Sequence, residues 1–298
     1  MLEASRSPGL TRPTASSVIP IVRAALAEDI GSGDITTLAT VPPGAWAEGW
    51  FLAKSPGIVA GLWVTEMVFA ELSPDIHLEF DVGEASPVVA GQTIGRLRGP
   101  AQPILSGERV ALNFLQRLSG IATAAQAAVA AVAGTSARII DTRKTTPGLR
   151  VLEKYAVRAG GAANHRFGLY DMVLIKDNHI RLSGGIAAAV AGARRSVGPM
   201  VKIEVEAANL DQVREAVAAR VDLIMLDNMT TQQMREAVDL IAGQAIVEAS
   251  GGVTLTNCAD VAAAGVDLIS MGSLTHSYMA LDISLELELS LGPTPDAG

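Results

Sequence analysis

Hydrophobic and polar residues change their rhythm near residue 136 of this 298-residue chain. Beyond that point, short apolar runs rich in β-branched residues recur at 137–141, 171–175, 200–205, 222–227, 245–249 and 267–271. Most of the intervals between them carry the helical spacing of apolar residues, at 184–196, 209–219, 231–242 and 256–264. Strands that alternate with helices in this way predict a parallel sheet, and six successive units favour an α/β barrel.

The chain before residue 136 follows a different pattern. Residues 1–17 are polar and rich in Ser, Thr and Pro, which is typical of a disordered tail. Apolar positions from Ile19 to Leu26 predict a short amphipathic helix. Short apolar runs separated by Gly and Pro over 46–97 predict a β-rich segment with a helix at Val64–Leu72. A long helical region follows, with a break expected at Ser119-Gly120.

Polar residues gather where the predicted strands of the second half end. Six positions lie at or just past a carboxyl end: Asp141, Lys176, Glu206, Asp227, Ser250 and Gly272. In α/β barrels this rim carries the active site, so we expect a site there. Within one predicted strand, alternate residues put Lys202, Glu204 and Glu206 on the same face. We expect this face to point into the barrel, where Glu204 would pair with Lys202. A half-exposed edge strand would show the same alternation.

Composition narrows the class of protein. Apolar residues make up 49 % of the chain and aromatic ones 4 %, a mixture typical of an α/β enzyme. A pI near 5.1 argues against a nucleic-acid surface. The single cysteine, Cys258, excludes an internal disulfide, fits a reducing compartment and is expected to be buried. No apolar run reaches the roughly 18 residues that span a membrane, and no signal-peptide pattern opens the chain, so we expect a cytoplasmic protein.

Charge is distributed unevenly in this acidic chain. From Arg138 to Arg181 there are nine Lys and Arg residues against four Asp and Glu, an excess of +5 in a chain whose net charge is −8. Such a segment is costly to hold together unless an anion neutralises it. The sequence therefore predicts a small, multiply charged anionic ligand.

Two loops in this segment supply most of the cations. Thr142, Arg143 and Lys144 follow the first strand, and their hydroxyl, guanidinium and ammonium groups suit carboxylate or phosphate oxygens. His165 and Arg166 form part of the second loop; Arg166 can hold a carboxylate bidentately, and His165 is as well explained by a structural role as by ligand binding. The alternative for the loop with Thr142, Arg143 and Lys144 is a solvated loop without a ligand. Lys154, which lies between the two loops, could be a surface lysine.

The later strand ends offer carboxylates and glycines. Glu206 and Asp227 end adjacent strands, so we expect their carboxylates to converge on Mg²⁺, through waters, or on sugar hydroxyls. General acid and base roles are the alternative. Loops of this type at the end of a barrel can cradle a phosphate with backbone N–H groups, and two of them follow the last two strands: Ser250-Gly251-Gly252 and Met271-Gly272-Ser273.

Taken together, these motifs resemble a known family. DTRKTTPGLR, EKYAVRAGGAANHRFGLYDMVLIKDNHI, KIEVE, LDN, SGGV and DLISMGSLTHS are similar to the successive motifs of quinolinate phosphoribosyltransferases, the carboxylating nicotinate-nucleotide pyrophosphorylases. EDIGSGDITT and SGERVALNFLQRLSGIAT, earlier in the chain, resemble the same family. The resemblance runs from about residue 18 to residue 286.

The resemblance implies an α/β fold in two domains. It implies an N-terminal α/β sandwich-like domain over 18–113, joined by the C-terminal residues 281–298, and an incomplete α/β barrel of about seven strands over 114–280 that holds the active site. Since only six barrel strands are visible in the sequence pattern, one strand is expected to be irregular.

The resemblance also implies the reaction and its participants. Quinolinate and phosphoribosyl pyrophosphate would give nicotinate mononucleotide, CO₂ and pyrophosphate with Mg²⁺, a step of NAD biosynthesis. Members of the family assemble as homodimers or larger homo-oligomers, in which the arginine matching Arg109 reaches the neighbour's quinolinate. Neither nucleic acid nor a membrane is an expected partner.

Site residues carry over onto matching positions. Arg109, Arg143, His165 and Arg166 would hold the two carboxylates of quinolinate, and Lys144 and Lys176 would lie between the pyridine ring and the phosphates. Glu206 and Asp227 would take the ribose hydroxyls and Mg²⁺. Phosphate would contact the two late loops, which comprise Ser250, Gly251, Gly252, Met271, Gly272 and Ser273, and Thr142 would also contact substrate.

Other functions remain open from the sequence. A related phosphoribosyltransferase would use nicotinate, or would be the relative associated with molybdenum transport. A Schiff-base lyase or aldolase could use Lys144, Lys176 or Lys202. A ligand-binding module without activity is the third alternative, although the carboxylates Glu206 and Asp227 argue against it.

Overall fold

The computed structural model describes residues 10–290. Most of the expected N-terminal tail, residues 1–9, therefore lies outside the described residues, as do residues 291–298. The chain divides into two compact units. The N-terminal unit contains the chain up to Ala124, residues 146–160 and the chain from Tyr278 onward, and the parallel-sheet unit contains residues 125–145 and 161–277.

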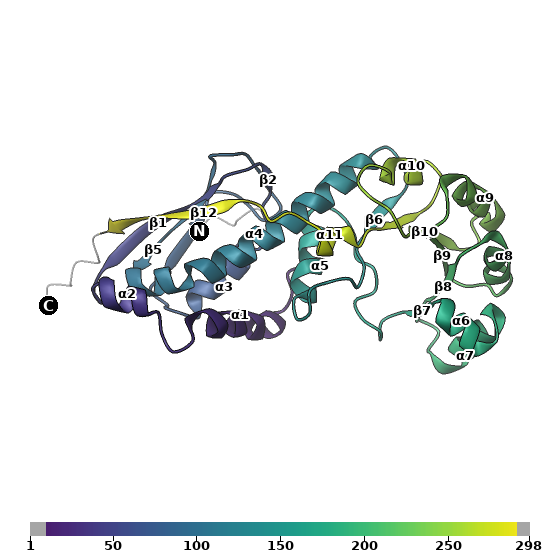
Figure 1. Ribbon diagram of the computed structural model, residues 1–298, viewed down its shortest axis with the longest axis horizontal. Coiled ribbons are helices and arrows are strands. Elements are labelled where there is room, and N and C mark those ends of the chain that lie inside the picture. The colour runs from purple at the N-terminus through teal and green to yellow at the C-terminus, as the bar shows by residue number, and fades with distance from the viewer. Residues whose placement is uncertain (1–9, 291–298) are drawn as a thin grey trace. The chain divides into compact units, whose positions relative to one another are not determined.

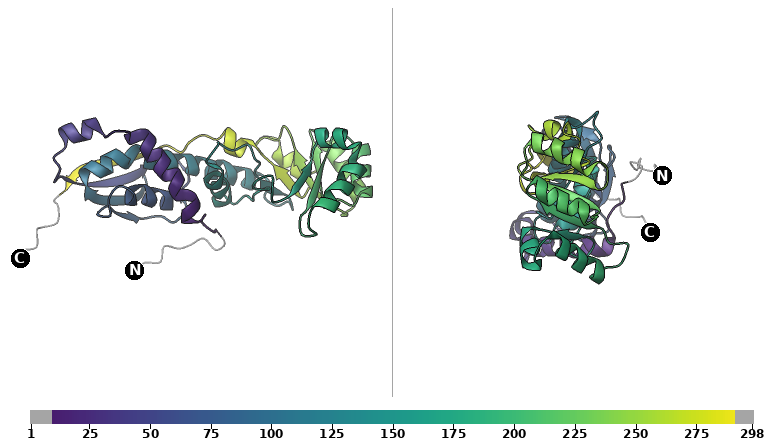
Figure 2. Two further views of the ribbon diagram at one scale, coloured as in Figure 1. Left: turned by 90° about the horizontal axis from the view of Figure 1, so that it is seen from below. Right: turned by 90° about the vertical axis from the view of Figure 1, so that its right-hand side faces the viewer.

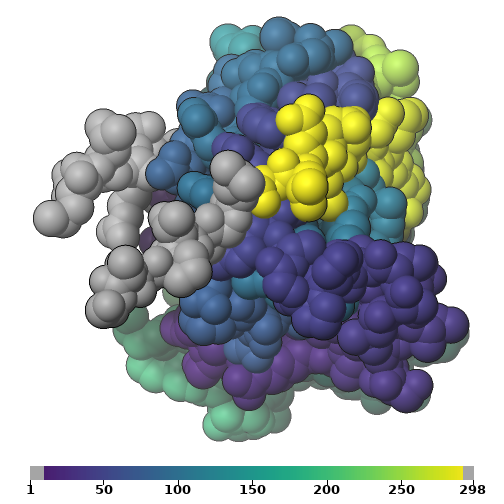
Figure 3. Space-filling view, turned by 90° about the vertical axis from the view of Figure 1, so that its left-hand side faces the viewer, coloured from purple at the N-terminus to yellow at the C-terminus, as the bar shows by residue number. Residues whose placement is uncertain are grey.

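A four-stranded antiparallel sheet is the centre of the N-terminal unit. Its strand order is β12 (Ile283–Ser290), β1 (Trp46–Ala53), β5 (Thr93–Pro100) and β3 (His77–Phe80), while β2 (Gly57–Ile58) and β4 (Pro87–Val88) form a separate pair. Alternate residues of β1 are buried, as expected for a sheet with one covered face. The C-terminal strand β12 thus lies beside β1 (Figure 1), and its yellow surface borders that of the early chain (Figure 3).

The helices α3 (Leu62–Ala70) and the first part of α4 (Ala101–Ala131) lie along this sheet (Figures 1 and 2). The unit also contains α1 (Ala15–Ile30), α2 (Ile35–Thr40) and α5 (Arg150–Ala159). The ring centroids of Phe51 on β1 and Phe69 on α3 lie 6.5 Å apart in a T-shaped contact, which places α3 on the apolar face of the sheet. The predicted helices at Ile19–Leu26 and Val64–Leu72 are confirmed as α1 and α3, and α1 begins at Ala15, inside the expected tail.

The helix α4 corrects one prediction. It continues through Ser119 and Gly120, where the sequence predicted a break. Both residues serve close packing, because the Ser119 hydroxyl accepts a hydrogen bond of 3.0 Å from the backbone N–H of Ala60, and a Cβ atom at Gly120 would overlap the carbonyl oxygen of Met279. A glycine inside a helix costs only about 1 kcal/mol, so this packing outweighs the cost.

Residues 114–124 and 146–160, which the resemblance places in the barrel, group with the N-terminal unit. The reason is apolar burial: on α5, Tyr155 is 1 % exposed and its ring lies 5.3 Å from that of Trp63 in an edge-on contact. Lys154 of the same helix is also buried, at 2 % exposure, so it is not a surface lysine.

Six parallel strands form the sheet of the second unit, as the sequence predicts. The strands are β6 (Arg138–Ile140), β7 (Val173–Ile175), β8 (Ile203–Ala207), β9 (Leu223–Asp227), β10 (Ile246–Ser250) and β11 (Leu268–Ser270), and the order is β6-β11-β10-β9-β8-β7. Ala163 forms one isolated parallel bridge with Ile140. Where the resemblance implies a seventh strand, the described chain therefore has a single bridge beside β6.

The four helices predicted between the strands are confirmed as α7 (Ile186–Ser196), α8 (Leu210–Ala218), α9 (Thr231–Ile241) and α10 (Cys258–Ala262). Two short helices, α6 (Asp177–Ser183) and α11 (Ser273–His276), were not predicted. Figure 1 shows α8 and α9 on the outer side of the sheet. Local sequence fixes their starts, because the Asn209 side chain accepts from the backbone of Gln212 and Thr230 forms a capping box with Gln233.

Two predictions about single features can be settled here. Cys258 is fully buried, as expected. No helix among residues 10–290 combines the length and the apolar character needed to cross a membrane.

Candidate active site

A cavity of about 710 Å³ opens in the parallel-sheet unit, where the strands end. Most of the predicted site residues line it: Thr142, Arg143, Lys144, His165, Arg166, Lys176, Glu206, Asp227, Ser250, Gly251, Gly252, Gly272 and Ser273. The parallel strands explain this grouping, because they bring residues far apart in sequence to one edge. The role of each side chain in this cavity is still a prediction from the sequence.

Two predicted site residues do not line the cavity. Arg109 lies on α4 in the N-terminal unit with an exposed side chain. Met271 is 2 % exposed, and its backbone N–H donates to the carbonyl of Ile140. It therefore anchors the last loop, while its neighbour Gly272 faces the cavity. A Cβ at Gly272 would lie 2.9 Å from Cδ of Lys144, so glycine leaves room for that lysine.

Arg166 is the most constrained of the cations. Its Nη1 donates to the carbonyl of Met172 at 3.0 Å, and its Nε is buried with no hydrogen-bond partner among the described residues. Burial lowers the pKa of Arg166, and the nearby Arg143 charge lowers it further. An anion between the two guanidinium groups would supply the missing acceptor and relieve their repulsion.

The loop that carries Arg166 is held by Asp141, which follows β6. One Asp141 oxygen accepts from the His165 backbone at 2.8 Å and the other accepts from the Asn164 amide at 2.6 Å. Asp141 is fully buried. Its position at a strand end, which first indicated a site residue, thus reflects the support of a cationic loop.

Glu206 and Asp227 lie on the adjacent strands β8 and β9 and line the same cavity. Lys176 Nζ lies 3.0 Å from Oε2 of Glu206, and the Asn228 amide donates to Oδ2 of Asp227 at 3.0 Å. In the sheet register Asp227 is the partner of Ser250, so this carboxylate lies beside the start of the glycine loop.

The first of the two late loops has an unusual backbone. Gly251 and Gly252 have φ of 84° and 65°, a left-handed conformation that suits glycine. Consecutive backbone N–H groups in such turns converge on an anion. Gly272, at the end of the next strand, borders the same cavity.

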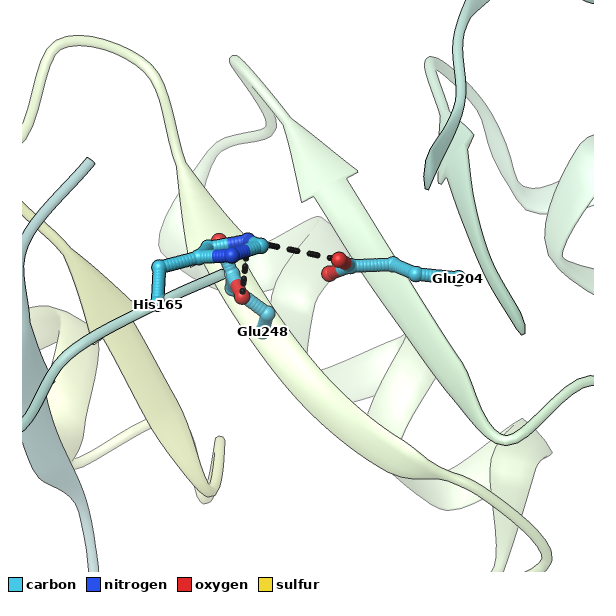
Figure 4. A group of neighbouring side chains, drawn as sticks. All are labelled: His165, Glu204 and Glu248. Atoms are coloured by element: carbon cyan, nitrogen blue, oxygen red, sulfur yellow. Dashed lines mark ion pairs between the residues drawn. The ribbon is translucent and has the colours of Figure 1, made fainter. Parts of the chain in front are cut away.

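Behind the cations lies a buried trio that sequence reasoning did not identify. Figure 4 shows His165 from its loop, Glu204 from β8 and Glu248 from β10 pointing toward one another. The His165 Nε2 lies 3.3 Å from Glu204 and 3.5 Å from Glu248, and its Nδ1 accepts from the Arg166 backbone at 2.6 Å. The imidazole therefore ties the Arg166 backbone to two buried carboxylates.

This trio corrects the predicted pairing of Glu204 with Lys202. The strand β8 begins at Ile203, and the Lys202 side chain is exposed while Glu204 is fully buried. Desolvation raises the pKa of Glu204 to about 7 and that of Glu248 to about 8, where the Glu204 charge adds to the effect. Near neutral pH the pair therefore holds a proton that exposed glutamates would have lost.

The trio is also a possible metal site, since its ligand atoms lie within 4.8 Å of one another. An imidazole and two buried carboxylates suit a transition metal more than Mg²⁺, which prefers oxygen ligands and keeps several waters. Glu206 and Asp227 are less buried and offer oxygen atoms only. They fit Mg²⁺ better than the trio does.

Besides Glu248, the cavity is lined by residues that sequence reasoning missed: Leu174, Met225, Asn228, Val253, Thr254, Ser270 and His276. Asn228 follows the strand-end residue Asp227 directly, which was a usable signal. His276 lies on the short helix α11, and no sequence pattern singled it out.

Comparisons with known proteins agree with this arrangement. Residues 34–119 match the family model described as the N-terminal domain of quinolinate phosphoribosyl transferase, and residues 121–286 match that of its C-terminal domain. A Bacillus subtilis protein named probable nicotinate-nucleotide pyrophosphorylase (carboxylating) is 47 % identical over 263 residues, which cover 88 % of this chain and 91 % of that protein. The quinolinate phosphoribosyltransferase (decarboxylating) 1b of Nicotiana tabacum is 42 % identical over 290 residues, with 91 % and 82 % covered.

Solved structures lead to the same family. NadC from Streptococcus pyogenes superposes with a TM-score of 0.91 at 40 % identity, covering 94 % of this chain and 99 % of that one. The nicotinate-nucleotide pyrophosphorylase of Francisella tularensis gives a TM-score of 0.90 at 37 % identity, covering 95 % and 100 %. The predicted combination of an N-terminal α/β domain with a parallel α/β unit is thereby confirmed. The resemblance read from the sequence is confirmed as well: the chain belongs to the quinolinate phosphoribosyltransferase family.

Proposed function

We propose that this chain transfers a phosphoribosyl group to quinolinate with loss of CO₂, yielding nicotinate mononucleotide and pyrophosphate for NAD biosynthesis. Family membership supports the reaction. The cavity supports the proposal at the level of residues, because it is lined by Glu206, Asp227, two glycine loops and four cations: Arg143, Lys144, Arg166 and Lys176. A pyridine diacid and a pyrophosphorylated sugar together match that set of groups.

Quinolinate recognition rests on the cationic side of the cavity. Arg143 and Arg166 would each take a carboxylate, and the partnerless Nε of Arg166 supplies a donor that the protein leaves unused among its described residues. Both ring nitrogens of His165 already face protein groups, so His165 would support this side of the site by holding the Arg166 backbone. Nicotinate has a single carboxylate, so it would leave part of this charge unneutralised.

Phosphoribosyl pyrophosphate would occupy the remaining side. Glu206 and Asp227 would contact the ribose hydroxyls, and Lys144 and Lys176 would lie between the pyridine ring and the phosphates. Thr142, Ser250 and Ser273 would donate hydroxyl hydrogen bonds to phosphate, together with backbone N–H groups of the two late loops. The Lys176–Glu206 ion pair of 3.0 Å would then be shared with substrate.

Glu206 and Asp227 would also hold Mg²⁺, through waters. When bound, the ion would neutralise the charge that develops on the leaving pyrophosphate. The protein's own contribution is the placement of two oxygen donors on adjacent strands, beside the start of the glycine loop.

The chemistry needs positioning more than proton transfer. The quinolinate ring nitrogen would attack the anomeric carbon as its bond to pyrophosphate breaks, and Glu206 and Asp227 would stabilise the positive charge on the sugar. Lys144 and Lys176 would stabilise the departing phosphate oxygens. When the adjacent carboxylate leaves as CO₂, the electron pair of the broken C–C bond stays on that ring carbon, where the positive charge of the ribosylated nitrogen would stabilise it. A proton from water would then add to the same carbon and complete the step.

We include a homodimer or larger homo-oligomer in the proposal. Arg109 is exposed on α4 and does not line the cavity of its own parallel-sheet unit. Donation of Arg109 to the quinolinate of a neighbouring subunit would give the diacid a further cation. We also propose a cytoplasmic location, which the single, buried and unpaired thiol of Cys258 supports.

The test is direct incubation of the purified protein with quinolinate, phosphoribosyl pyrophosphate and Mg²⁺, with nicotinate in a parallel reaction. We expect nicotinate mononucleotide and CO₂ in equal amounts from quinolinate, and little product from nicotinate. Product from nicotinate at a comparable rate, without CO₂, would contradict the proposal.

A further inference from the structure

Asn228 lies between two groups that the proposed function uses. Its side-chain amide donates to Oδ2 of Asp227 at 3.0 Å, and its backbone N–H donates to the carbonyl of Ser250 at 2.9 Å. One residue thus contacts both a carboxylate assigned to ribose and Mg²⁺ and the first residue of the proposed phosphate loop. With one oxygen of Asp227 held by the amide, the other keeps a fixed orientation.

The contact with the phosphate loop continues at Gly251. A Cβ atom on Gly251 would overlap the Asn228 carboxamide, with Cγ 2.6 Å and Nδ2 2.9 Å away. The Asn228 side chain therefore packs directly on the backbone of the loop. Any side chain at Gly251 would displace either the loop or the amide.

The backbone of Asn228 is itself unusual. Its φ is 53°, in the left-handed region that non-glycine residues rarely adopt. Asparagine tolerates this conformation better than most residues. The turn directs the chain away from β9 immediately after Asp227 while leaving the carboxamide beside that carboxylate. Glycine would also permit the turn, but it would not supply the amide.

We propose that Asn228 is a positioning residue for phosphoribosyl pyrophosphate, acting by fixing the Asp227 carboxylate relative to the Ser250–Gly252 loop. The inference rests on the proposed function, because it takes Asp227 and that loop to hold the ribose and a phosphate. It adds a residue that touches neither the reacting atoms nor quinolinate in this assignment.

The first test separates the amide from the turn. Asn228→Gly keeps the left-handed turn and removes the amide, so we expect about a tenfold fall in kcat/KM for phosphoribosyl pyrophosphate, with the KM for quinolinate within about twofold. Calorimetric titration with phosphoribosyl pyrophosphate and Mg²⁺ should show the same weakening. Asn228→Asp places a second carboxylate beside Asp227 and should lose more, about a hundredfold.

A matched control guards against a general effect of glycine. Ala242 also adopts a left-handed conformation, with φ of 48°, at the end of α9 in the same unit, and it does not line the cavity. Ala242→Gly should leave kcat and both KM values unchanged. Thermal unfolding of each variant shows whether it is folded, and a loss of activity in Asn228→Gly without a lower melting temperature supports positioning.

A double-mutant cycle tests the contact with the loop. Gly251→Ala should be severely impaired in the wild-type background, because the new methyl group meets the carboxamide. Removing that carboxamide in the double variant Asn228→Gly/Gly251→Ala should recover part of the loss, so that the two effects are not additive. Additive losses would overturn the proposed contact.

The outcomes distinguish this inference from the function on which it rests. If the wild-type protein forms no nicotinate mononucleotide, the proposed function fails and the inference fails with it. If the wild type is active and Asn228→Gly keeps its kcat/KM and affinity for phosphoribosyl pyrophosphate, only the inference is overturned. A selective loss on the phosphoribosyl pyrophosphate side supports it.

Discussion

The buried trio of His165, Glu204 and Glu248 makes a quantitative prediction about stability and pH. Glu248→Gln removes one ionisable carboxyl and keeps its shape. Burial raises the pKa of Glu248 to about 8, whereas a glutamate in an unfolded chain titrates near 4.3. Between these values the folded protein keeps a proton that the unfolded protein releases, so the stability provided by that proton is lost as the pH rises.

The size of the effect follows from these two pKa values. Between pH 6 and pH 9, ionisation of this single group lowers the free energy of unfolding by a few kcal/mol. Glu248→Gln cannot ionise, so its stability should fall less over the same interval, by about that amount. The new amide can donate to Glu204, which limits the cost of the substitution at low pH.

The assay must report on the right part of the chain. All three tryptophans, Trp46, Trp50 and Trp63, lie in the N-terminal unit, so fluorescence would follow the wrong unit. Hydrogen exchange of the β10 amides, corrected for the intrinsic pH dependence of exchange, measures opening at Glu248 itself. Glu215→Gln, an exposed change on α8, is the control. Equal pH dependence in the wild type and in Glu248→Gln would show that this carboxyl does not hold a proton near neutral pH in the folded protein.

Three further predictions test other parts of the account. Arg143→Ala removes a charge-assisted contact to quinolinate and should lower kcat/KM for quinolinate by ten- to a hundredfold, since such contacts are worth roughly 1.5–3 kcal/mol; near-normal turnover at low quinolinate would contradict this. Gly120→Ala should destabilise the N-terminal unit by about 1–3 kcal/mol in calorimetry, because its methyl group meets the Met279 backbone; an unchanged transition would show that this packing is loose. The variants Arg109→Ala and Lys144→Ala can be purified separately, mixed and allowed to exchange subunits. If the arginine is donated between subunits of a dimer, the mixture should recover about a quarter of wild-type activity. No recovery would place Arg109 outside the shared site.

Periodicity was sufficient to predict the second half of the fold. The helices α7, α8 and α9 each bury one face, and the strands β8, β9 and β10 are short runs buried on nearly every residue, so apolar spacing and run length report both. The seventh strand could not be read in this way, because Ala163 makes a single bridge and has no run of apolar neighbours. The predicted break at Gly120 failed for a different reason: the glycine leaves room for a distant carbonyl, and no local pattern encodes that approach.

The site was predictable as far as strand ends could indicate it. The strand ends of one parallel sheet carry Lys176, Glu206, Asp227 and Ser250, and these residues line one cavity. The partner of Glu204 was not predictable, because Glu248 belongs to β10, two strands away in the sheet order, and such neighbours are set by three-dimensional layering. The position of Asn228 directly after Asp227 was a usable signal, but its contacts depend on a left-handed turn that hydropathy does not report.

We expect the guanidinium groups beside the cavity to hold a pyridine diacid against an activated sugar. A crystal structure of the protein with quinolinate would show whether they do. The two carboxylates should lie at hydrogen-bond distance, about 3 Å, from the guanidinium nitrogens of Arg143 and Arg166, with the ring nitrogen facing Glu206 and Asp227. Quinolinate bound elsewhere, or both guanidinium groups directed into solvent in the complex, would contradict it.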